Sequence, residues 1–388
     1  MTTWCTVVLC LLLNSGLVYC DFEDIGHSAR AIGMGNTYTG LADDANAVFY
    51  NPAGLRMLSC AELSSSYSKL WWGLKDISEE HTIGDGAVSF AYPTEKYGTL
   101  GIGLMNMAVG GLYSESVYAF SYARTFSGNI FGGLTLKLLN KGYGQTSDTT
   151  NAWNNARKAS NKPDPVFDQD YSKGGFSVDL GVLYKLHDSN VFGLSLSDIN
   201  QPNMDLQDET TKIPLGVKVG YAYKRPMVVF ATDIKNRGKD TSVSLGVERW
   251  VHRTFAVRGG LDIGSRDYRT VSLGFGYRAS RFIGADYSFM YPLSGIVNTY
   301  GTHRFSLSVR FGRGYTLSTT DASEEVELLR YEIESLMGRL ESAGIKDVRS
   351  ASTVPGTIKL DEKKISTIFD EGMTFYIAGK YDEAIAKF

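Results

Sequence analysis

Residues 270–278 read Thr-Val-Ser-Leu-Gly-Phe-Gly-Tyr-Arg, and a large apolar side chain stands at every second position. The apolar positions run from Val271 to Tyr277, with small or polar residues between them. This period of two is typical of a β-strand with one apolar face, because successive side chains of a strand point to opposite sides. The same alternation returns in three further stretches: 176–186, 215–223 and 283–291.

The alternation predicts an all-β transmembrane barrel of about 14 antiparallel strands between residues 63 and 313. The expected strands of roughly 9–13 residues match a tilted membrane strand better than the usual globular strand of about 5–6 residues. They lie near 64–72, 85–92, 98–109, 114–126, 129–140, 174–187, 190–199, 213–224, 226–236, 241–252, 254–263, 269–280, 282–291 and 303–313.

A soluble β-sandwich also alternates and is the alternative to a barrel. A barrel of about 14 strands is too wide for side chains to fill, so its lumen is polar and its apolar face points outward. Connections after even-numbered strands are short, like the periplasmic turns of outer-membrane barrels. Several connections after odd-numbered strands are long: 73–84, 141–173, 200–212 and 292–302. The loop lengths therefore favour the barrel, although the loops after strands 3, 9 and 11 are short as well.

The composition bears on nucleic-acid binding, metal binding and catalysis. The net charge of −3 gives no basic excess, so we expect no nucleic-acid partner. Outside the first 20 residues Cys60 is the one cysteine, and neither a disulfide framework nor a metal site is expected. We expect surface histidines, no cofactor and no enzymatic activity, since no catalytic constellation stands out. The five histidines are His27, His81, His187, His252 and His303.

Residues 1–20 predict a secretory signal peptide. They carry no charged side chain and contain a short apolar run at 7–13, although no Lys or Arg precedes it. Cleavage after Cys20 would leave Asp21 first. The alternative is a lipoprotein signal with lipid on Cys20, in which bulky Tyr19 stands where a small residue is expected. No run of 18 apolar residues follows, which excludes a helical membrane protein.

The segment at 21–62 predicts a hatch, or plug, inside the lumen, because its small residues suit close packing. We expect Asp43 and Asp44 to cap a short helix through Tyr50. The Asn51-Pro52 pair should end that helix, because the residue before a proline avoids helical angles.

This segment resembles the FadL superfamily of outer-membrane proteins, and more closely its PorV-like branch. The matching runs are Arg-Ala-Ile-Gly-Met-Gly at 30–35, Ala-Asp-Asp-Ala at 42–45 and Asn-Pro-Ala-Gly at 51–54. The family fold is a 14-stranded barrel closed by an N-terminal hatch, and the resemblance implies that Asn51, Pro52 and Ala53 belong to the hatch motif. The candidate gate residues are Gly33, Gly35, Asp43, Asp44, Asn51, Pro52 and Ala53.

The resemblance implies two functions. FadL-type transporters move long-chain fatty acids and other hydrophobic molecules, which predicts passive uptake across the outer membrane. PorV-like members serve protein secretion, which predicts a structural or secretion-associated barrel. The expected partners are outer-membrane lipid, hydrophobic small molecules, the barrel-assembly machinery and a periplasmic protein. The strand at 303–313 suits the assembly machinery because it resembles the terminal strand that this machinery recognises.

After residue 313 the apolar period becomes helical. A short heptad seam at 314–349 predicts an amphipathic or coiled-coil helix that docks on a partner or on the barrel floor. Its residues are Val326, Leu329, Ile333, Leu336 and Leu340. The stretch 350–388 resembles part of a tetratricopeptide repeat, with Gly379 at the inter-helix turn and Tyr381 and Ala384 packing between helices. One such unit cannot bury its own face, so either it packs on a partner, which is expected to be periplasmic, or the sequence is a fragment.

Overall fold

The structure is a computed structural model that describes residues 21–74, 82–145, 167, 170–187, 189–206, 211–265, 268–280, 282–296 and 298–312. The chain divides into two compact units, Met1–Glu325 and Val326–Phe388. The predicted signal peptide, the heptad seam and the repeat turn at Gly379 all lie outside the described residues. No helix in the described ranges is long and apolar enough to cross a membrane.

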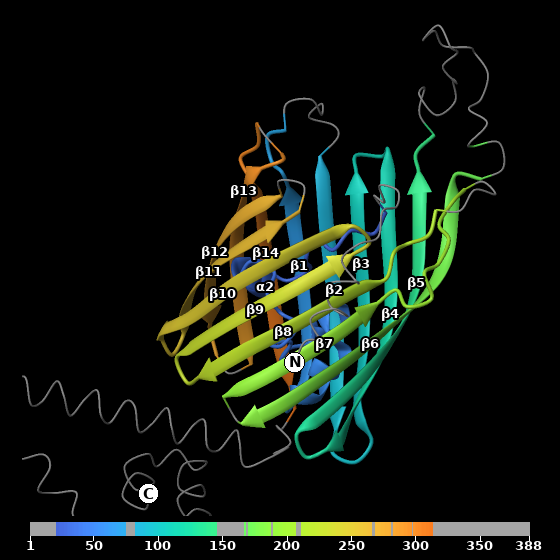
Figure 1. The fold of residues 1–388 in the computed structure, drawn as a ribbon. Coiled ribbons are helices and arrows are strands. Elements are labelled where there is room, and N and C mark those ends of the chain that lie inside the picture. Colours follow the sequence, from blue (N-terminus) through green and yellow to red (C-terminus); the bar gives the residue numbers. More distant parts are fainter. Residues whose placement is uncertain are drawn as a thin grey trace, which may run out of the picture. The chain divides into compact units, whose positions relative to one another are not determined.

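Fourteen antiparallel strands of the described residues close into one barrel, which confirms the predicted fold class and excludes the sandwich (Figure 1). Each strand pairs with its neighbours in sequence, and β1 closes the ring on β14. The strands are β1 (Ala61–Leu70), β2 (Ile83–Thr94), β3 (Gly98–Val109), β4 (Tyr113–Ser127), β5 (Ile130–Tyr143), β6 (Ser172–His187), β7 (Asn190–Ser197), β8 (Gly216–Arg225), β9 (Val228–Arg237), β10 (Asp240–His252), β11 (Phe255–Gly264), β12 (Arg269–Arg278), β13 (Ile283–Ser294) and β14 (Thr302–Phe311).

The outer face of the barrel is apolar and the inner face is polar. In β12, Leu273 and Phe275 are exposed while Ser272 is buried. The pairing register places Leu273 opposite Phe289 of β13, so apolar side chains line up across neighbouring strands. An apolar band that continues from strand to strand around a closed sheet is typical of a surface that faces lipid.

The two ends of the barrel differ in their connections. Turns such as 128–129, 226–227 and 253–254 join strands at one end, which we call the short-turn end. The connections 71–82, 144–171 and 198–215 lie at the other, the long-loop end. β1 begins and β14 ends at the short-turn end, as expected for an even number of strands.

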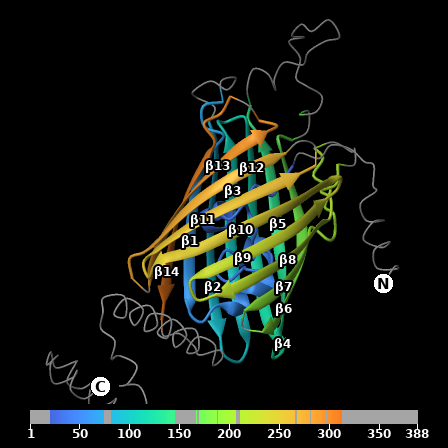
Figure 2. The ribbon, with the colours of Figure 1, turned by 60° about the vertical axis from the view of Figure 1, so that its left-hand side comes forward.

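Residues 21–60, which we call the lumen segment, lie inside the barrel (Figure 2). The segment contains two short α-helices, α2 (Ala29–Gly33) and α3 (Ala47–Tyr50), and a 3-10 helix, η1 (Pro52–Met57). Most of its side chains are buried, including His27, so the expectation of surface histidines is wrong at that position. The barrel wall surrounds His27 because α2 follows it directly and contacts β11 to β14.

Candidate functional site

Glycines on the inner wall let the lumen segment approach the barrel backbone. A Cβ added at Gly33 would lie 3.0 Å from Cα of Gly274 in β12. Gly35 has a φ of +68°, and a Cβ there would lie 2.8 Å from both the N and the O of Leu261. These two candidate gate residues therefore lie where α2 and its C-terminal turn contact β11 and β12, and no larger side chain fits at Gly35.

The hatch motif lies on the opposite side of the lumen, against β5 and β6. The Asn51 side chain is fully buried: Nδ2 donates to the carbonyl of Thr39 at 2.9 Å, and Oδ1 accepts from Ala53 N–H at 3.2 Å. Asn51 thus caps η1 while tying it to the preceding turn. Ala53 N lies 2.4 Å from where a Cβ of Gly133 would be, so Pro52 and Ala53 need a glycine in the wall.

Arg30, at the second position of α2, is the centre of a buried ion network. Its Nε and Nη2 donate to both carboxylate oxygens of Glu248 in β10 at 2.9 Å. Its Nη1 donates to Asp43 at 2.6 Å. Glu248 also accepts from Arg258 of β11 at 2.6 Å, and Arg258 reaches Asp286 of β13 at 2.6 Å. The network therefore joins the lumen segment to three strands, and the sequence reasoning missed Arg30 although it begins the quoted 30–35 motif.

The predicted capping role is wrong for Asp43, whereas Asp44 Oδ1 accepts from Asn46 N–H at 2.9 Å, just before α3. Helix α3 begins at Ala47, and its N-cap residue makes no side-chain capping bond. Asp43 instead pairs with Arg30 and, at 2.8 Å, with Lys224 of β8. Asp44 accepts from the Tyr38 hydroxyl at 2.6 Å. At Asp43, ion pairs with Arg30 and with Lys224 of the barrel wall take the place of local capping.

The two neighbouring carboxyls have opposite pKa shifts. Burial alone would raise the pKa of Asp43, but Arg30 and Lys224 hold that pKa well below its usual range. Burial, followed by the nearby Glu62 carboxylate, raises the pKa of Asp44 from 3.8 to about 7. Asp44 therefore changes its charge near neutral pH, whereas Asp43 stays ionised.

We expect the barrel to lose stability as pH rises through about 7. Asp44 keeps its proton in the folded state above the pKa of the unfolded chain, so its contribution is complete below about pH 3.8 and is lost near its folded pKa of about 7. Melting temperatures between about pH 5 and about pH 8 should fall by several degrees. Asp44→Asn should flatten the fall of melting temperature with pH. Asp43→Asn should lower the melting temperature at every pH and leave its pH dependence unchanged. An equal slope in Asp44→Asn would contradict the assignment.

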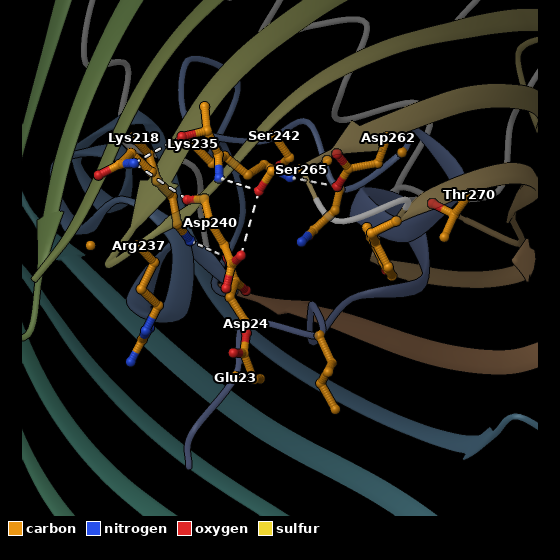
Figure 3. Close-up of a pocket in the computed structure, with 18 of the residues that line it drawn as sticks. Glu23, Asp24, Lys218, Lys235, Arg237, Asp240, Ser242, Asp262, Ser265 and Thr270 are labelled. Carbon is orange, nitrogen blue, oxygen red and sulfur yellow. Dashed lines mark hydrogen bonds and ion pairs between the residues drawn. The ribbon is translucent and has the colours of Figure 1, made fainter. Parts of the chain in front are cut away.

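A cavity of about 370 Å³ lies between the lumen segment and the long-loop end; we call it the vestibule. Figure 3 shows charged side chains from the lumen segment and from β8 to β11 gathered around it. Lys218 pairs with Asp24 of the lumen segment, and Lys235 lies 3.4 Å from Asp262. Apolar side chains complete the lining: Ile25, Ile32, Trp71 and Met290. The vestibule is thus a mixed surface on which the cations already have carboxylate partners.

No sequence pattern predicted the vestibule, because its wall comes from seven strands, β7 to β13, and its floor from residues near the N-terminus. Among the described residues, no group of three or more His, Cys, Asp or Glu side chains could hold a metal ion. The arrangement can therefore do two things chemically: obstruct the lumen, and bind a small solute above the obstruction.

An apolar outer face, a closed ring of strands and a lumen occupied by the chain's own N-terminal segment define an outer-membrane β-barrel. The family model of the type IX secretion system membrane protein PorP/SprF matches residues 44–310. The chain belongs to this family. No curated protein matches the sequence.

Solved channel structures share the fold at low sequence identity. The CymD monoaromatic hydrocarbon channel has a TM-score of 0.57 at 14% identity, covering 75% of this chain and 99% of that one. The toluene transporter TodX of P. putida has a TM-score of 0.55 at 13% identity, covering 75% and 100%. The toluene transporter TbuX of Ralstonia pickettii has a TM-score of 0.56 at 12% identity, covering 75% and 100%. These similarities concern the fold.

Proposed function

We propose that this protein is a closed, structural barrel of a type IX secretion system, and that it is not a pore for free diffusion. The observation that carries the proposal is the way the lumen segment is fixed: backbone contacts at wall glycines and a buried ion network on both of its halves. The family match at 44–310 supports the secretion role.

The charges of the lumen weigh against a path for hydrophobic molecules. A hydrocarbon entering the vestibule would displace water from Lys218, Lys235 and Asp262, and removing water from charged groups is costly. Displacing the segment further would separate Arg30 from Glu248, which leaves charge unpaired in a buried place. A fixed lumen segment suits a scaffold better than a channel.

In this proposal the C-terminal stretch supplies the partner contact. The helix at 314–349 and the repeat-like stretch at 350–388 stay predictions, as does the closer PorV-like resemblance. Their apolar seam, from Val326 to Leu340, suits a periplasmic protein partner, because a helix with only two heptads is marginal alone and needs another surface to cover its apolar side. β14 ends at the short-turn end, which is periplasmic in outer-membrane barrels.

Removing residues 314–388 is expected to abolish secretion while leaving the barrel in the membrane. The measurement compares the export of proteins that use the type IX pathway in a deletion strain complemented by the full chain or by the shortened one. The control is the amount of heat-modifiable barrel in the outer membrane, which should be equal. Normal export from the deletion strain would remove the proposal.

Uptake of hydrophobic molecules, including fatty acids, is the second candidate. The observations that favour it are the vestibule and the fold shared with the monoaromatic channels. It predicts lipid or fatty acid bound to barrel purified from native membranes, and slower uptake of labelled fatty acid in the deletion strain. Loss of uptake with unchanged export would favour this candidate over the first.

A further inference from the structure

The first described residues lie at the long-loop end of the lumen. The Asp21 carboxylate pairs with Lys141 Nζ at 2.6 Å and accepts from the Tyr113 hydroxyl at 3.3 Å. Tyr113 begins β4 and Lys141 lies near the end of β5, and both of these strand ends are at the long-loop end. Residue 21 and the start of β1 at Ala61 therefore lie at opposite ends of the barrel.

Phe22 fixes this position. Its N–H donates to Glu115 Oε1 at 2.9 Å, and its ring is buried at 7% exposure. Its φ of +55° turns the chain, a conformation that is uncommon for residues other than glycine and needs support from its surroundings. That support is an apolar cluster from the wall and from the connection after β7: Ala87, Met105, Val117, Leu139, Met204 and Ile213.

From Phe22 the chain crosses the lumen. Asp24 pairs with Lys218 of β8, and the His27 carbonyl accepts from the Ser66 hydroxyl of β1. Ala29 N–H donates to the Ser306 hydroxyl of β14 at 2.9 Å. Contacts on opposite walls thus hold residues 21–29, and the segment separates the vestibule from the lumen below.

The cluster around Asp21 holds more carboxyl groups than cations. Among the described residues it holds two carboxylates, Asp21 and Glu115, and one cation, Lys141. Glu115 is 3% exposed and Lys141 is 5% exposed, so little water reaches either group and a nearby cation would stabilise the Glu115 carboxylate. Tyr113 O–H and Phe22 N–H both donate to Oε1 of Glu115, so neither of these two donors uses Oε2.

We propose that Asp21 is the N-terminus of the mature protein and that its α-ammonium binds Glu115 at the long-loop end of the lumen. Hydrolysis of the Cys20–Asp21 amide by a signal peptidase consumes one water, leaves a carboxylate on Cys20 and frees an amine on Asp21 that takes up a proton. The new charge balances the cluster. The lipoprotein alternative predicts instead a mature chain that begins at Cys20.

The N-terminus can be identified directly. Full-length protein extracted from native outer membrane is sequenced from its N-terminus, and its intact mass is measured. The expected result is a chain that begins at Asp21. A blocked chain that begins at Cys20 with added acyl mass, or a chain that begins at any other residue, would overturn the proposal.

Binding of the ammonium is tested by its protection from an amine-reactive reagent at neutral pH, with the modified N-terminal peptide measured by mass spectrometry. Glu115→Gln should label at least about tenfold faster than the wild type, the factor that about 1.4 kcal/mol of protection gives. The matched control is Glu95→Gln, in the exposed turn between β2 and β3, which should label as the wild type does.

Tyr113→Phe provides a second variant should Glu115→Gln fail to fold, since it removes one bond to Glu115 and keeps the aromatic ring packed on Tyr143. It should label faster than the wild type, though less so than Glu115→Gln. A wild-type amine that reacts as fast as that of a free peptide, or equal rates in wild type and both variants, would refute the bound ammonium. Neither measurement depends on secretion or uptake, so the proposed function can fail without affecting this result.

Discussion

Replacing Gly260 by alanine is expected to turn the closed barrel into a conducting one. The added Cβ would lie 2.0 Å from Gly35 N and 2.2 Å from Met34 C, both backbone atoms of the lumen segment. Backbone atoms cannot rotate away as a side chain can, so the segment itself must move. Overpacking of this kind costs about 1–3 kcal/mol or more. Conductance in planar bilayers should rise from near zero to that of an open lumen, with a lower melting temperature.

Gly259→Ala is the matched control, one residue away on the same strand. Gly259 lies on the outer face of β11, where an added Cβ would meet Val247 Cγ1 at 3.8 Å, an ordinary contact. Its conductance and stability should stay within about 0.5 kcal/mol of the wild type. If both variants were equally closed and equally stable, backbone contact at Gly260 would not be what holds the lumen segment.

The fold was predictable because the lipid-facing side of each strand must be apolar along its whole length. That requirement produces an alternation with a period of two along the strand, as in 270–278. The alternation can be recognised without knowing which strands pair. The strand expected at 269–280 is β12 (Arg269–Arg278), and the strand expected at 190–199 is β7 (Asn190–Ser197). The ends differ by a few residues because alternation fades where a strand leaves the lipid.

The inner contacts were not predictable in the same way. Small residues at Gly33 and Gly35 indicated close packing, but their partners are glycines of β11 and β12, far away in sequence. Capping rules assigned Asp43 a local role, whereas Arg30 and Lys224 determine its position. Arg30 could have been singled out as a lone charge inside a run of small apolar residues, which seldom buries a cation without a partner.

Glu248→Gln is expected to release the lumen segment by leaving two arginines without their shared carboxylate. Glu248 is 1% exposed and accepts from Arg30 at 2.9 Å and from Arg258 at 2.6 Å. Removing one member of a buried ion network costs about 3–5 kcal/mol, because the remaining charges stay buried and uncompensated. The melting temperature should fall by more than about 5 °C, and bilayer recordings should show an opened lumen.

The control is Arg249→Gln, the next residue of β10, whose side chain is exposed; stability and conductance should stay near the wild type.

The double variant Arg30→Met with Glu248→Met distinguishes charge pairing from packing. When both partners are replaced by apolar side chains, no lone charge remains on this pair, so the loss should be smaller than the sum of the single losses by about 0.5–3 kcal/mol. Additive losses would mean that Arg30 and Glu248 act on the barrel independently, and the ion pair would then not be what fixes the lumen segment.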